Sequence, residues 1–371
     1  MQKIVGAKIR RLREDIGLTQ EELARAAGCS NEFISLLELG KRDPSLSTLT
    51  DISRFLKKDI SYFLSKKENP FDVLLKKREY TVLRSILKEF QIYCRRYTEL
   101  EEMSERSLQT APLYTHLSAE RMADQERRRM APGRFLNGRL FDMLELHGLR
   151  ICRQVYPKES KAAGVFVFLE RRQAAFVSIN AHLPLERQNM VAVHAYAHYL
   201  RDRLDGPIVD NLDIFIPEYL TLYPGREAYA QTFARHFLLP GHHVLDILDN
   251  DLRVKNPEMA DIHYLRRLFS APGDEVLQVL FETGRISKSS LQRMRRHFPH
   301  MLRNGREGAI PKNIDNAAEE LLRPSIRYRS LCVSACRRKK IEREQLKEWL
   351  YGENPAPEIE ENPVSDPEEG N

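Results

Sequence analysis

In residues 18–49, residue types that begin a helix alternate with residue types that end one, and this pattern constrains the fold more than any other feature. Thr19, followed three residues later by a glutamate, forms a capping box that begins a short helix. Gly28 then permits a tight turn, and Ser30 can cap the next helix. We therefore expect short, closely packed helices over residues 1–66.

Two short helices joined by a tight turn, inside a five-helix unit, are the plan of a helix-turn-helix, whose second helix enters the major groove of DNA. The run LTQEELARAAGCSNEFISLLELGKRDPSLSTL resembles the XRE family of lambda-repressor-like regulators. The resemblance implies a double-stranded DNA operator as partner. A helix-turn-helix that makes only protein contacts is the alternative.

The same resemblance implies roles for single positions. The DNA-facing positions would be Gln20, Asn31, Glu32 and Ser35. Asparagine can read adenine through two hydrogen bonds, and glutamate can accept one from cytosine. Lys41 and Arg42 would contact phosphates, which adds salt dependence rather than base selectivity. Arg13 and Glu38 would form an ion pair between the first and third helices.

Residues 67–139 are predicted to connect two folded parts. Residues 71–105 favour one long helix, because apolar side chains recur every three or four positions. This seam contains Leu83, Ile86, Phe90, Tyr93, Tyr97 and Leu100. It can pair with a second copy of the chain or pack on its own chain, and the sequence leaves both open. Residues 107–139 are polar and rich in arginine, which predicts a linker with a short helix.

The middle of the chain changes to β-rich runs. Residues 150–156, 164–170 and 174–181 predict strands separated by turns. A long helix then begins near Pro184, because proline suits the first helical turn. A second helix is predicted over residues 227–239.

The first of these two helices carries a pair of histidines. His194 and His198 lie four residues apart, so both imidazoles share one helix face and can hold one zinc ion. A zinc peptidase of this type also needs a third ligand and a glutamate directly after the first histidine, as general base. Ala195 stands at that position, so no catalytic residue is intact.

The sequence around the histidines resembles the ImmA/IrrE family of metallopeptidases. The resemblance rests on the β-rich runs, on Ser178-Ile179-Asn180 and on EAYAQTFA followed by LLP. It implies a zincin-like α+β fold, Zn²⁺ as cofactor and Glu227 as the third metal ligand. Ala195 is then either natural to a sensor or structural pseudo-peptidase, or an inactivating change in an enzyme. A packed histidine pair without metal is the remaining interpretation.

Together these patterns predict a mainly α protein with a small β-sheet. We expect a helix-turn-helix domain at 1–66, a long helix and linker at 67–139, a metallopeptidase-like domain at 140–300, a helical C-terminal module at 301–352 and a disordered acidic tail at 353–371.

Composition narrows the functional classes. The net charge of +6 is compatible with a nucleic-acid partner once the charge is placed on a surface. Five cysteines are an odd number in a long chain, which favours a reducing cytoplasm over a disulfide framework. No apolar run approaches the roughly 18 residues that a membrane helix needs. A membrane protein and a disulfide-rich secreted protein are therefore disfavoured.

Three functions are compatible with this sequence. The first is a transcriptional regulator, a repressor in its simplest form, that binds DNA as a homodimer and senses a signal or a protein partner through its second domain. The second is a zinc metallopeptidase that cleaves a repressor or itself in a stress, mobile-element or phage-defence response, seen here in inactive form. The third is an interaction scaffold. Ala195 favours the first over the second, and the intact helix-turn-helix pattern favours the first over the third.

Overall fold

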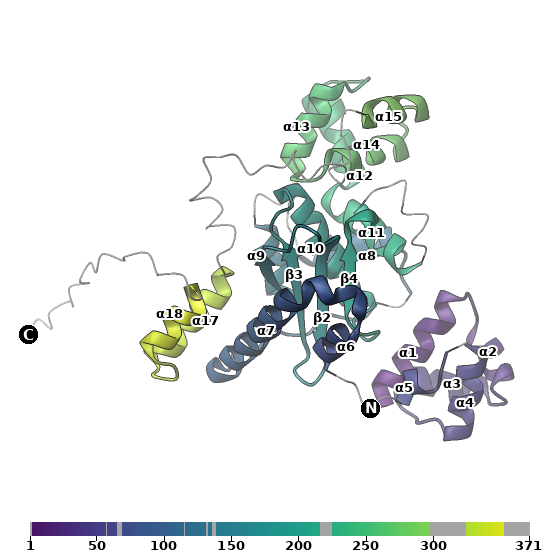
Figure 1. Ribbon diagram of the computed structural model, residues 1–371. Coiled ribbons are helices and arrows are strands. Elements are labelled where there is room, and N and C mark those ends of the chain that lie inside the picture. The colour runs from purple at the N-terminus through teal and green to yellow at the C-terminus, as the bar shows by residue number, and fades with distance from the viewer. Residues whose placement is uncertain are drawn as a thin grey trace, which may run out of the picture.

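The computed structural model describes residues 2–56, 58–64, 69–114, 116–130, 133–135, 139–215, 225–296 and 324–351. The predicted tail at 353–371 and the start of the predicted C-terminal module lie outside these residues. Figure 1 shows an N-terminal helical bundle beside a central sheet that helices cover. The described part is mainly helical with a small sheet, as the sequence predicts.

The N-terminal bundle contains α1 (Gln2–Asp15), α2 (Gln20–Ala26), α3 (Asn31–Glu38), α4 (Leu46–Phe55) and α5 (Ser61–Leu64). The capping box is formed: the Thr19 hydroxyl accepts from the Glu22 amide, and the Glu22 carboxylate accepts from the Thr19 amide. Gly28 has a φ of 61°, the left-handed conformation that the turn between α2 and α3 requires. A core that includes Ile9, Leu23, Ile34 and Leu37 holds these helices together.

The central sheet is formed by β1 (Leu149–Gln154), β2 (Ala162–Leu169), β3 (Ala174–Asn180) and β4 (Ile208–Asn211). Within the described residues the strand order is β1-β3-β2-β4, with β1 parallel to β3 and the other pairs antiparallel. β2 and β3 are buried on both faces, which explains their nearly continuous apolar sequence. β4 is a short edge strand that the sequence patterns did not predict.

One face of the sheet is covered by a helical segment that the sequence had suggested to be continuous. It consists of α6 (Pro70–Lys76), the 3₁₀ helix η1 (Arg78–Leu83) and α7 (Arg84–Ser104). The break arises because Lys77 adopts an extended backbone, with ψ at 124°. The apolar seam packs on its own chain: Phe90 and Tyr97 are fully buried in one core with Phe176 of β3 and Tyr328. The seam is therefore not free to pair with a second copy.

The other face is covered by α9 (Leu140–Leu146) and α10 (Leu185–Arg201), and behind them α11 (Arg226–Leu238) packs on α10 and α8 (Ala119–Met130) packs on α11. α8 lies within the stretch that the sequence predicts to be a linker, yet Met122 and Ala123 are fully buried in the core of this domain. The charged side chains of α8 suggested an exposed linker in the sequence, but in the structure they are paired inside the protein. Glu126, for example, is fully buried and accepts hydrogen bonds from Tyr114 and Tyr196.

Shorter elements follow α11. They are α12 (Gly241–Asp246), the π-helical turn η4 (Ile247–Asp251), α13 (Met259–Phe269), α14 (Gly273–Glu282), α15 (Lys288–Arg295), α17 (Ile326–Arg337) and α18 (Arg343–Tyr351). α17 packs along α7, beside which it is drawn in yellow in Figure 1. Among the described residues, no helix has both the length and the apolar character needed to cross a membrane.

Candidate functional sites

The first candidate site is the exposed face of α3. Asn31 and Glu32, its first two residues, are exposed, and Ser35 lies one turn later and is half-buried. Lys41 and Arg42 are exposed in the turn after α3, and the Arg42 guanidinium lies 4.9 Å from the centre of the Phe33 ring. The structure thus places polar groups that can contact bases at the start of α3 and cationic groups beyond its end.

A buried ion pair fixes α3 against α1 and α2. The Arg13 guanidinium donates to both carboxylate oxygens of Glu38, at 2.6 and 3.0 Å, and to the carbonyl oxygen of Leu18 at 2.6 Å. The hydrogen bonds that Arg13 donates to Glu38 raise the pKa of Arg13, so the guanidinium stays charged. Gln20 donates to the same carboxylate at 2.8 Å and is half-buried. Gln20 is therefore tied to this ion pair, beside the face on which the sequence places a DNA contact.

The second candidate site is a cluster of possible metal ligands from α10, α11 and β4. His194 and His198 point from one face of α10 toward Glu227, which stands in the first turn of α11. The Glu227 Oε2 atom lies 3.2 Å from Nε2 of His194 and 3.3 Å from Nε2 of His198. The three predicted ligands therefore come together although Glu227 belongs to another helix.

Neighbouring side chains orient these ligands. Asp202 lies 2.7 Å from Nδ1 of His198, which turns the Nε2 atom of that ring toward the cluster. Arg226 donates to the other oxygen of Glu227 at 2.9 Å. The side chain of His194 is held by ring contact with Phe215, at 5.2 Å between centroids.

Burial and neighbouring charges act in opposite directions on the pKa values of this cluster. Burial works to lower the pKa of His198, but hydrogen bonds and the charges of Asp202 and Glu227 raise this pKa to about 10. Burial works to raise the pKa of Glu227, yet the two histidines hold it below its ordinary value. Without a metal ion, His198 therefore holds a proton, and its positive charge compensates the carboxylates of Asp202 and Glu227.

Asp210 is the residue of this cluster that sequence reasoning missed. Its Oδ1 atom lies 3.7 Å from Nε2 of His194 and 3.8 Å from Nε2 of His198. Ligand atoms of all four side chains lie within 4.8 Å of one another. The only local signal was an acidic residue directly after the apolar pair Ile208 and Val209, which does not by itself indicate a ligand.

Ala195 is fully buried and belongs to the apolar core of this domain. Its neighbour Tyr196 donates to Glu126 at 2.6 Å and accepts from Arg129, so this hydroxyl is engaged in the core. Neither residue supplies a base to the histidine cluster.

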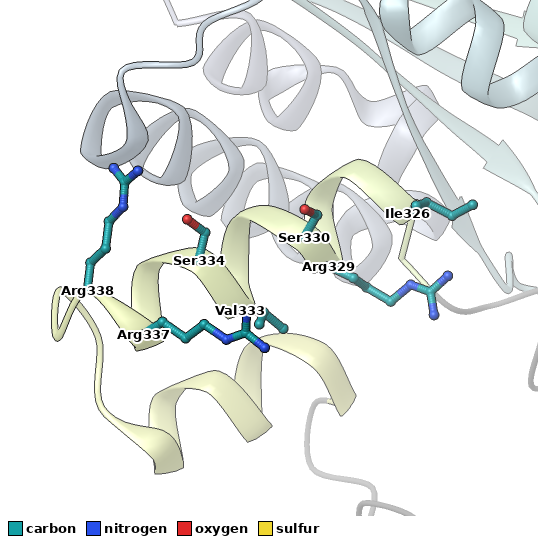
Figure 2. A pocket seen from close by; sticks show the side chains of 7 residues that line it. All are labelled: Ile326, Arg329, Ser330, Val333, Ser334, Arg337 and Arg338. Atoms are coloured by element: carbon teal, nitrogen blue, oxygen red, sulfur yellow. The ribbon is translucent and has the colours of Figure 1, made fainter. Parts of the chain in front are cut away.

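A separate pocket follows one face of α17 (Figure 2). It is lined by Ile326, Arg329, Ser330, Val333, Ser334, Arg337 and Arg338. Two apolar and three basic side chains therefore share this surface. None of the four clustered residues lines it, so the pocket and the cluster are separate features.

Comparison with known proteins concerns the N-terminal bundle. The family model described as helix-turn-helix matches residues 9–63, which run from α1 to α5. An uncharacterized HTH-type transcriptional regulator, y4dJ of Sinorhizobium fredii, is 43% identical over 56 residues, which make up 15% of this chain and 73% of that protein. Through its N-terminal bundle, this chain belongs to the helix-turn-helix family.

Proposed function

We propose that this protein is a sequence-selective, DNA-binding transcriptional regulator. The observation that carries the proposal is the exposed start of α3, held by the buried Arg13–Glu38 pair within a helix-turn-helix. In this geometry the first residues of the second helix reach base edges in the major groove. Asn31 and Glu32 would read bases, with Ser35 and Gln20 at the margin of the contact.

Binding energy would come largely from phosphates. Lys41 and Arg42 are exposed beyond the end of α3 and would contact the DNA backbone. One such domain covers little DNA, so we propose that a homodimer binds paired half-sites and acts as a repressor. The buried seam of α7 is not the dimer contact in this proposal, because its own chain covers it.

The second domain would act as a sensor. The Tyr62 hydroxyl of the bundle donates to Asp205 at 2.8 Å, and Lys8 donates to the Tyr62 carbonyl oxygen at 2.8 Å. Asp205 lies one turn after Asp202, the hydrogen-bond partner of His198. The Asp205 amide donates to the Asp202 carbonyl oxygen at 2.9 Å. A change at the histidine cluster, caused by Zn²⁺ or a protein partner, would reach the DNA-binding domain through this short connection.

A selection experiment with the full-length protein tests the DNA proposal. We expect a preferred operator to emerge from random double-stranded DNA. Asn31→Ala and Glu32→Ala should each relax base preference at one position, by about 1–3 kcal/mol. The exposed Lys347→Ala change on α18 serves as control and should leave the preference intact. Enrichment of no sequence, with salt-insensitive binding, would contradict the proposal.

The grouping of His194, His198 and Glu227 favours one alternative, a zinc metallopeptidase that cleaves a repressor or itself. When bound, zinc would polarise a peptide carbonyl and activate water. The absence of a carboxylate at Ala195 removes the proton carrier, whose loss typically costs two to four orders of magnitude in rate. Specific cleavage that appears in Ala195→Glu and vanishes after a further His198→Ala change would support this alternative.

A further inference from the structure

Asp210 is a buried carboxylate without an ordinary partner. Its side chain is fully buried, and neither oxygen has a hydrogen-bond partner among the described residues. Burying a carboxylate without compensation is costly, so buried charges are normally paired or bind metal ions.

The position of Asp210 follows from the sheet. Side chains alternate between the two faces of a strand, so Ile208 and Asp210 point to the same face of β4. Ile208 belongs to the core that contains α10 and α11. The edge strand therefore delivers one carboxylate to the histidine pair, in addition to the carboxylate that α11 contributes.

The spacing of the four ligand atoms suits a tetrahedral ion. Metal–ligand bonds of about 2.0–2.2 Å put neighbouring ligand atoms about 3.3–3.6 Å apart in a tetrahedron. The Glu227 oxygen lies 3.2 and 3.3 Å from the two histidine nitrogens, and the Asp210 oxygen lies 3.7 and 3.8 Å from them. Contraction of a few tenths of an ångström on the Asp210 side brings these four distances to the tetrahedral values, and all the ligand atoms already lie within 4.8 Å of one another.

Charge supports the same conclusion. Once a binding metal ion has displaced the proton of His198, two ionised carboxylates and two neutral imidazoles carry a charge of about −2, which one divalent cation neutralises. A site with Glu227 as its single carboxylate would retain a positive charge, which favours ionisation of a water molecule. Asp210 removes that charge and occupies the position that a catalytic zinc site keeps open.

We propose that Asp210 is a fourth protein ligand, and that His194, His198, Asp210 and Glu227 form a closed Zn²⁺ site. This inference rests on the metal binding that the proposed function includes. A closed site joins β4, α10 and α11 and has no position for a substrate. It is a structural or sensory site, and it lacks both requirements of a peptidase: a base at Ala195 and an open coordination position.

Metal content of the full-length protein is the first test. Wild-type protein should hold about one zinc per chain, measured by mass spectrometry after dialysis against a weak chelator. Asp210→Asn should lower zinc affinity by more than the 10–100-fold that loss of an outer-sphere partner causes. Asp210→His, which keeps a ligand at this position, should restore the zinc affinity. Asp213 lies nearby and is partly exposed, and Asp213→Asn should leave the zinc affinity unchanged. Equal affinity of Asp210→Asn and wild type would overturn the proposal.

A spectroscopic test needs no variant that could fail to fold. Co²⁺ in place of zinc should give intense tetrahedral bands that azide does not change, because no open position remains. Azide-sensitive bands in the wild type would refute a closed site but leave metal binding intact. Binding of neither Zn²⁺ nor Co²⁺ would refute the metal site altogether, whereas the operator selection decides the regulatory function independently.

Discussion

The buried pair of Arg13 and Glu38 should control both the stability of the N-terminal bundle and the placement of α3. Arg13→Met keeps the apolar stem but removes two hydrogen bonds to Glu38 and one to the Leu18 carbonyl oxygen. The Glu38 side chain, only 1% exposed, would then retain its charge with one donor, Gln20 at 2.8 Å.

The structure sets the magnitude. Removing one member of a buried ion pair costs about 3–5 kcal/mol, because the remaining charge loses its compensation. That corresponds to a fall in the equilibrium constant for folding of the bundle by roughly two to three and a half orders of magnitude. Replacing both residues by apolar ones, Arg13→Met with Glu38→Leu, should recover most of this loss, since no buried charge is then left unpaired.

Hydrogen exchange of the α3 amides in the full-length protein measures this effect locally. The matched control is Arg25→Met, which breaks an ion pair on the surface. The side chains of Arg25 and Glu21 in this pair are 76% and 72% exposed. The control should change stability by no more than about 0.5 kcal/mol. Equal loss of protection in Arg13→Met and Arg25→Met would refute the role assigned to the buried pair.

Three further perturbations address the DNA face, the metal cluster and the sheet. Lys41→Ala and Arg42→Ala should each weaken DNA binding evenly across sequences and reduce the slope of log K against log salt by about 0.9, as measured by fluorescence anisotropy over a salt series. An unchanged slope would exclude both from phosphate contact. Asp202→Ala should lower zinc affinity about 10–100-fold in a competition with a chelator, because His198 loses the partner that orients it. Affinity equal to wild type would remove that role. Phe90→Ala should destabilise the sheet domain by about 3–5 kcal/mol in urea, because this ring of α7 is fully buried in the core and packs on Phe71 of α6. The exposed Val82→Ala is its control, and similar losses in both would contradict the packing described.

The sequence by itself determined the elements that depend on near neighbours. The capping box at Thr19 and the turn at Gly28 are local, since their hydrogen bonds and backbone angles involve residues within a few positions. The central strands β1 to β3 and the helices α10 and α11 were also predictable, because their patterns extend over several residues. The shared face of His194 and His198 follows from helical periodicity alone.

Tertiary structure decided what depends on distant neighbours. The seam of α7 was equally suited to a second copy or to its own sheet, and only the presence of Phe176 and Tyr328 opposite it selects the sheet. α8 looked like a polar linker, because Glu126 reads as a solvated charge until Tyr114 and Tyr196 are placed beside it.

The histidine cluster also combines residues that local sequence indicates with one that only the tertiary structure brings in. Local periodicity supplied the histidine pair, and a family resemblance suggested Glu227. Asp210 stands in a four-residue edge strand, too short for its alternation to be recognised in sequence. Its position beside the histidines is visible only when pairing with β2 brings that strand next to α10. Such a contact joins residues through the folded core, and no pattern of neighbouring residues encodes it.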